Sequence, residues 1–178
     1  MRTVDVLVAT KKFFSENPDQ WTTGNLHAVR NAKNCFCALG GIALQSGCMS
    51  ELGMQARNVF VSCTSGPVTA DPNGPEAYNP VFSKIESLSK KAIKSYESKG
   101  IHLVAGAKAT AYLARAVKDL FGETKLIVGI NDNHNLGLPA IMKALDLAIA
   151  RAKRRHIKGD KGRVRAKRAV AVEQAVTQ

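Results

Sequence analysis

Aromatic side chains and long apolar runs are scarce in this sequence of 178 residues. Aromatic residues make up only 6% of it, although hydrophobic residues make up 45% and alanine is abundant. Because β-sheets draw on aromatic and β-branched side chains, this balance favours packed helices over a β-sandwich. No stretch approaches the ~18 consecutive apolar residues that indicate a membrane span. We therefore expect a soluble protein with a helical core.

The N-terminal segment lacks the features of a secretory leader, because it is short and Asp5 interrupts its apolar residues. The chain has four cysteines, Cys35, Cys37, Cys48 and Cys63. Disulfides persist in oxidising compartments, so without a leader we expect free thiols and a cytoplasmic protein. If a phage encodes the chain, that location is the host cytoplasm or the virion.

Motifs for nucleotide binding and for paired carboxylates are also missing. The segment Gly40–Gly47 (GGIALQSG) is rich in glycine, but it lacks the lysine and the spacing of a phosphate-binding loop. No pair of carboxylates recurs at helical spacing within an apolar segment. The sequence therefore predicts no cofactor and favours a protein that is not an enzyme.

Helical patterns, in which apolar residues recur every three or four positions, account for most of the chain. They predict helices over residues 3–15, 36–45, 51–61, 81–98 and 104–121, and a final helix with Pro139 at its first position. The alanines of 104–121 form one thin face that suits close packing, and Gly47 and Gly122 suit helix C-caps. The expected fold class is all-α, a compact bundle of five to seven helices.

Two segments connect these helices. Residues 24–34 are expected to form a connector in which short helical turns can occur, and residues 64–80, dense in Gly, Pro, Asn and Asp, a long loop. The short apolar run 125–130 fits either a strand or a helix end.

Positive charge is concentrated at the C-terminus. The net charge is +12, and residues 151–178 hold 10 Lys/Arg against 2 acidic residues. This predicts two parts, a helical globular domain over 1–150 and a basic arm over 151–178. The basic residues of the arm are Arg151, Lys153, Arg154, Arg155, Lys158, Lys161, Arg163, Arg165, Lys167 and Arg168.

Lys and Arg without aromatic neighbours bind phosphates but offer no stacking for bases. We therefore expect the arm to bind the backbone of DNA or RNA without sequence specificity. An acidic protein surface in an oligomer or a virion is the alternative partner, and a solvated tail without a partner is the simplest interpretation.

The segment Asn34–Gly47 (NCFCALGGIALQSG) is the centre of the predicted fold, because it holds a short helix that is apolar almost all round. Gly40 and Gly41 inside that helix each cost roughly 1 kcal/mol relative to Ala, which predicts a close approach of a second helix. Trp21 follows the turn at residues 17–19 and is expected to anchor that turn in the core.

These residues resemble a family of small proteins of unknown function from actinobacteria and their phages. The likeness rests on Trp21, on the segment 37–43 (CALGGIA) and on Ile130-Asn131-Asp132 ahead of the final helix. Where that family more often has alanine, this chain has Gly41, and the basic arm is not part of the family pattern. The family has no established activity, so the resemblance implies a phage-related protein and no mechanism.

Cys37, Asn131 and Asp132 have three possible roles, and the first is structural. In this interpretation Cys37 opens a buried helix, and Asn131 and Asp132 either cap the last helix or bind free N–H groups at the start of the Cys37 helix. The structural residues are then Trp21, Cys37, Gly40, Gly41, Asn131 and Asp132.

The other two roles are chemical. A thiol at a helix N-terminus has a lowered pKa, so Cys37 could be the nucleophile of a hydrolase with His134 as base and Asp132 or Asn131 as orienting group. A metal site could form from His27, Cys35, Cys37 and His134, although their spacing departs from that of common zinc sites. His102 and His156 have no such partners nearby in sequence and are expected on the surface.

Overall fold

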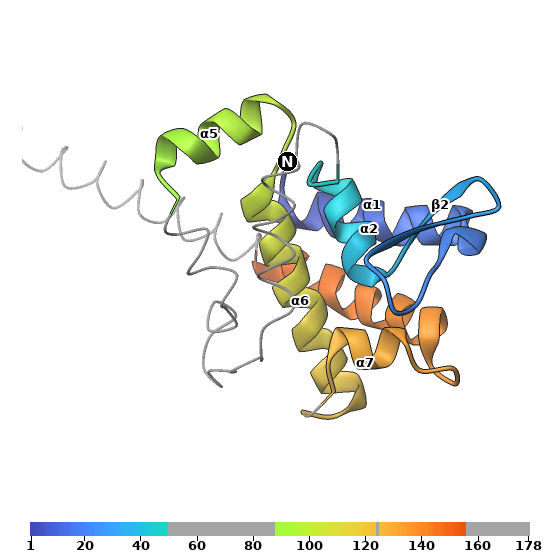
Figure 1. Cartoon of the computed structure of the whole chain (residues 1–178). Coiled ribbons are helices and arrows are strands. Elements are labelled where there is room, and N and C mark those ends of the chain that lie inside the picture. The colour runs from blue at the N-terminus through green and yellow to red at the C-terminus, as the bar shows by residue number, and fades with distance from the viewer. Residues whose placement is uncertain (50–87, 124, 156–178) are drawn as a thin grey trace, which may run out of the picture.

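The computed structural model describes residues 1–49, 88–123 and 125–155. Its elements are α1 (Thr3–Glu16), the 3-10 helix η1 (Pro18–Gln20), β1 (His27–Arg30), β2 (Lys33–Phe36), α2 (Ala38–Gln45), α5 (Lys90–Ser98), α6 (Leu103–Phe121), α7 (Ile127–Asn131) and a last helix over 137–155. This part of the chain is mostly helical, as predicted, but it also holds a two-stranded sheet (Figure 1). The helix expected over 51–61 and the loop over 64–80 lie outside the described residues.

Helix α6 is the central element of the fold. It contacts α1, α2, α5 and α7, and its buried residues extend well beyond the single stripe predicted from sequence. They are Leu103, Ala105, Gly106, Ala107, Ala109, Thr110, Ala111, Leu113, Ala114, Ala116, Val117 and Lys118. Small side chains around most of its circumference allow several helices to pack closely against it. Gly122 forms the C-cap, as predicted.

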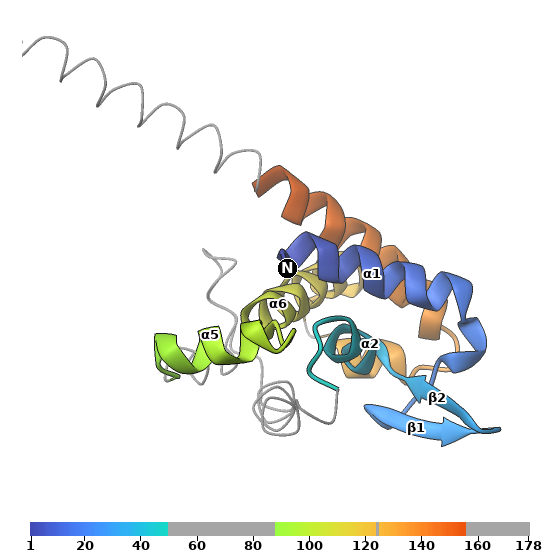
Figure 2. The ribbon, with the colours of Figure 1, turned by 90° about the horizontal axis from the view of Figure 1, so that it is seen from above.

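Helix α1 and the last helix lie side by side (Figure 2). Lys11 Nζ and Asp146 Oδ1 are 2.5 Å apart, and Lys153 lies near Val4 and Val8, so the two helices run in opposite directions. The last helix starts at residue 137, two residues before the predicted start at Pro139. It continues past the expected domain boundary at 150, and Ala152 belongs to the buried core.

Residues 27–36 form an antiparallel hairpin, where the sequence predicted a connector over residues 24–34; this small sheet accompanies a mostly helical fold. The turn residues Asn31 and Ala32 both have positive φ, at 50° and 58°, as in the two-residue turns whose twist suits a hairpin. Phe36 therefore belongs to β2 instead of the helix, and α2 begins at Ala38 with Cys37 as its N-cap.

Aromatic rings attach the hairpin to α1. Phe13 packs edge-on against Phe36 with ring centroids 5.8 Å apart, and Phe14 packs edge-on against Trp21 at 5.0 Å. Trp21 is half-buried against the core and follows η1 directly. A large share of the few aromatic residues in the chain thus gathers at this junction.

The two glycines inside α2 have different neighbours. A Cβ at Gly41 would lie 2.5 Å from Cε2 of Phe14 in α1, which is the predicted close approach of a second helix. A Cβ at Gly40 would lie 1.9 Å from the carbonyl oxygen of Leu26, so this glycine accommodates the backbone ahead of β1 and no helix. Both positions therefore exclude larger residues.

Helices α2 and α5 end against each other. Gly47 and Gly100 both have positive φ. At each helix end, the N–H of the glycine and the N–H of the next residue donate to carbonyls of the last helical turn, which is the Schellman arrangement. The Ser46 carbonyl accepts a hydrogen bond from His102 N at 2.8 Å. The C-termini of the two helices are thereby joined ahead of α6.

Candidate functional site

A buried polar side chain, Asn131, lies at the end of α7 and is 2% exposed. Its Oδ1 accepts a hydrogen bond from Ala38 N at 2.9 Å. Its Nδ2 donates to the Thr22 carbonyl at 3.2 Å and to Asp132 Oδ1 at 2.7 Å. One amide thus joins α7, the start of α2 and the chain after η1.

These contacts supply partners that a buried helix start needs. The first N–H groups of an α-helix have no partner within the helix, and leaving them unpaired away from water costs free energy. Asn131 binds the N–H of Ala38, and the Cys37 Sγ accepts from Gly40 N at 3.4 Å. The hydrogen bond expected between Asn131 and the Cys37 helix is therefore present.

Asp132 makes different contacts from those that the sequence predicted. Its Oδ1 accepts from Gly24 N at 2.9 Å as well as from the Asn131 amide. It therefore holds the segment ahead of β1, and in the described contacts it caps neither the last helix nor α2. We call Thr22, Gly24, Ala38, Asn131 and Asp132 the Asn131 contact group.

Cys37 does not have the lowered pKa that a nucleophile at a helix start requires. Burial raises the pKa of the Cys37 thiol, and the charge of Asp132 adds to the rise, while hydrogen bonds from Gly40 and Leu39 N–H groups only partly oppose it. The expectation of a lowered pKa was wrong because loss of hydration outweighs the helix N-terminus here. His134 is exposed, and no described hydrogen bond joins it to Cys37 or Asp132.

The four metal-site candidates are not brought together. Across residues 1–49, 88–123 and 125–155, no group of three or more His, Cys, Asp or Glu side chains could hold a metal ion. His27 Nε2 instead pairs with Asn34 Oδ1 at 2.9 Å across the hairpin, and the Cys35 thiol is directed at the Asp19 carbonyl at 3.8 Å. Cys35, Cys37 and Cys48 are buried free thiols, while Cys63 lies outside the described residues.

The basic arm is described only over residues 151–155. Arg151 is half-buried and pairs with Asp119 of α6, whose other oxygen lies 3.4 Å from Arg115 Nε. Arg151 therefore contributes to the packing of the last helix against α6, and its expected role as a phosphate contact stays a prediction. Lys153, Arg154 and Arg155 are exposed. The remaining arm residues and His156 lie outside the described part.

An open apolar groove of about 610 Å³ lies where α1 meets the last helix. Its lining combines three apolar residues with three cations and one carboxylate; the lining residues are Arg2, Val4, Asp5, Val8, Ala9, Lys12 and Lys153. Val8 is 42% exposed, which is unusual for a helical valine beside a core. Arg2 Nε donates to Asp5 Oδ2 at 3.0 Å, so the carboxylate of Asp5 neutralises part of the positive charge of the groove lining.

Sequence reasoning missed Thr22, Gly24 and Asp119. Thr22 and Gly24 contribute backbone atoms, which leave no pattern in a sequence. Asp119 had a weak signal, because Arg115 stands four residues before it on the same helix. Its pairing with Arg151 depends on how two helices cross, and this the sequence does not show.

None of the described helices combines the length and the apolar character needed to cross a membrane. The chain matches no protein-family model, no curated protein and no solved structure. The site must therefore be interpreted from its own geometry and charge.

Proposed function

We propose that this chain is a non-enzymatic, phage-related protein whose basic C-terminal arm binds the nucleic acid backbone without sequence specificity. The observation that supports it most is the density of charge after the last core residue. Beyond Ala152 the sequence places nine Lys/Arg within residues 153–168 and only one acidic residue, Asp160. The exposed Lys153 and Arg154 begin this run on the surface of the folded body.

Both chemical alternatives are weaker than this proposal. A hydrolase would need an ionised Cys37, and burial raises the pKa of that thiol instead. A metal enzyme would need a ligand cluster, and the described residues hold none. The phage origin rests on the resemblance of Trp21, residues 37–43 and residues 130–132 to the actinobacterial and phage family.

A salt series tests the proposal on the full chain. The arm variant replaces Arg163, Arg165, Lys167 and Arg168 by Gln, and binding to mixed-sequence DNA and RNA is measured. The matched control replaces Arg30, Lys108, Lys125 and Lys143, which are exposed on the body. The arm variant is expected to lose up to about four units of the salt slope, because each phosphate contact contributes roughly 0.9. Equal slopes in the two variants would contradict the proposal.

An assembly role is the second candidate, and the groove between α1 and the last helix favours it. A lining of apolar and mostly cationic side chains suits an acidic surface of another protein. A discrete oligomer that nuclease treatment leaves unchanged would support this role. A monomer at micromolar concentration would count against it.

A further inference from the structure

Helix α5 has the least buried surface of the long described helices, and its charge is uneven. None of its residues is buried. Ile93 and Tyr96 are half-buried and pack against the core. At about 100° per residue, Lys91 lies opposite the side of Ile93 and Tyr96. Lys94 lies about 100° from Ile93, and Lys90 lies at the border of that side, three residues before Ile93. All three lysines are exposed.

Several cations of the folded body have carboxylate partners, and the α5 lysines differ from these. The cations with a carboxylate within ion-pair distance are Arg2, Lys11, Lys12, Lys33, Arg115, Lys118 and Arg151. Within the described ranges no ion pair involves Lys90, Lys91 or Lys94. Exposed pairs add little stability, but they do reduce the field that a distant phosphate experiences. No carboxylate of the described residues therefore reduces the charge of the α5 lysines.

The positions of the three lysines do not stabilise α5. Lys90 and Lys91 are the first two residues of α5, where the helix dipole disfavours cations, and the first turn contains no acidic residue. Lys90 and Lys94 also repel each other at a four-residue step. Departures from local preference without a compensating contact are expected where a surface serves binding.

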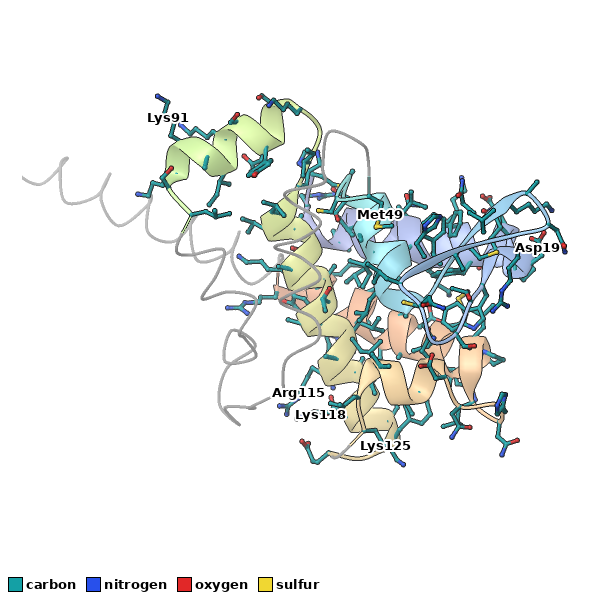
Figure 3. All side chains as sticks on the ribbon, in the orientation of Figure 1. Asp19, Met49, Lys91, Arg115, Lys118 and Lys125 are labelled. Carbon is teal, nitrogen blue, oxygen red and sulfur yellow. The ribbon has the colours of Figure 1, made fainter. Side chains whose placement is uncertain are left out.

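Helix α5 and the start of the basic arm both lie away from the hairpin. In both views the hairpin is on the right and the two elements are to its left, and Figure 2 shows α6 between α5 and the end of the last helix (Figure 1, Figure 2). Lys91 points away from α6 at the outer edge, whereas Lys125 lies near the opposite end of α6 (Figure 3).

We infer that the lysine face of α5, formed by Lys90, Lys91 and Lys94, is a second contact for nucleic acid phosphates and acts together with the arm. This inference rests on the proposed function. Phosphodiesters are the partner that the charge favours, because the apolar residues of α5 face the core and cannot enter a lipid bilayer. A helix that lies on a membrane needs its apolar face free.

The test uses the full chain and substitutes lysines by glutamine, which has a similar helix propensity. The α5 variant carries Lys90→Gln, Lys91→Gln and Lys94→Gln. The control carries Arg30→Gln, Lys125→Gln and Lys143→Gln, which removes the same charge from exposed positions away from α5. Circular dichroism establishes that both variants keep their helices.

Binding to mixed-sequence duplex DNA and single-stranded RNA is then measured across a salt series. The inference expects the α5 variant to have a shallower slope than the control, by about one unit for each lysine in phosphate contact. Equal slopes for the two variants, with tight binding by the unsubstituted chain, would overturn the inference alone. No binding by the unsubstituted chain would overturn the proposed function as well.

A parallel measurement with lipid vesicles distinguishes a membrane surface from nucleic acid as the partner of α5. Vesicles of phosphatidylcholine with phosphatidylserine should bind the α5 variant and the control equally. A loss of vesicle binding confined to the α5 variant, without a loss of DNA or RNA binding, would overturn the inference in favour of a membrane surface.

Discussion

The polar atoms of the Asn131 contact group are hydrogen-bonded inside the fold, whereas those of the lysine face of α5 are exposed to solvent. In the first, a 2% exposed amide shares its donors and acceptor among three partners inside the fold. In the second, exposed ammonium groups have no ion-pair partner among the described residues. Polar groups that are satisfied internally contribute to stability, whereas charges left toward solvent contribute to recognition. Substitutions in the two regions should therefore change different measurements.

The largest expected effect is on stability, at the glycine that adjoins the Asn131 contact group. In Gly40→Ala the new Cβ would lie 1.9 Å from the Leu26 carbonyl oxygen, a backbone atom that cannot rotate away. We expect a loss of about 3 kcal/mol in the free energy of unfolding. Chemical denaturation followed by circular dichroism measures it.

Gly129→Ala is the control for this substitution. Gly129 lies in α7, and a Cβ there would have no atom within 4 Å. Removing a helical glycine should stabilise that variant by roughly 0.5–1 kcal/mol. Similar losses in both variants would show that the Leu26 contact is not the cause.

The second effect separates stability from binding. Asn131→Ala leaves Ala38 N and the Thr22 carbonyl without their side-chain partner. A buried polar group without a hydrogen bond costs about 1–3 kcal/mol, so we expect a loss of about 2 kcal/mol. Asn135→Ala, at an exposed position nearby, should cost less than about 0.5 kcal/mol. Where Asn131→Ala remains folded, its salt slope on nucleic acid should equal that of the unsubstituted chain.

The smallest effect is a dependence on pH above neutrality. Burial raises the pKa of the Cys37 and Cys48 thiols above their ordinary value of 9.0. A thiol that holds its proton more tightly in the folded state stabilises the fold below the unfolded pKa, and this contribution is lost as pH rises through the folded pKa. Stability should therefore fall as pH rises past about 9.

Denaturation midpoints between pH 7 and pH 10.5, roughly spanning the ordinary thiol range, measure this dependence. Cys37→Ser and Cys48→Ser should each flatten the fall, because each removes one thiol that ionises in the unfolded chain. A fall of equal steepness in both variants and in the unsubstituted chain would assign it to other groups.

The sequence predicted the helices well where their ends carry strong signals. Thr3–Glu16 and Leu103–Phe121 lie within one residue of the predicted helices, because apolar periodicity and Gly122 mark their limits. The hydrogen bond from Ala38 to Asn131 followed from the need of a buried helix start for acceptors. These features depend on local rules that hold whatever the remaining fold.

The sequence did not predict the hairpin, because its turn and its strands lack the usual signals. Its turn residues, Asn31 and Ala32, both adopt positive φ, and alanine in that conformation is uncommon because its Cβ approaches the following carbonyl. The usual Asn-Gly signal is therefore absent. The strands also lack alternation, since Cys35 and Phe36 are both buried. Packing of Phe13 and Phe36, and not local sequence preference, holds this element in place.

The Asn131 contact group also limits when the N-terminal part of the chain can fold. Ala38 finds its acceptor 93 residues later, and Gly24 finds the Asp132 carboxylate 108 residues later. A chain growing on the ribosome cannot complete the start of α2 until residue 131 has left the exit tunnel. Because such distant contacts slow folding, the hairpin and α2 are expected to dock last, although they are among the first segments synthesised.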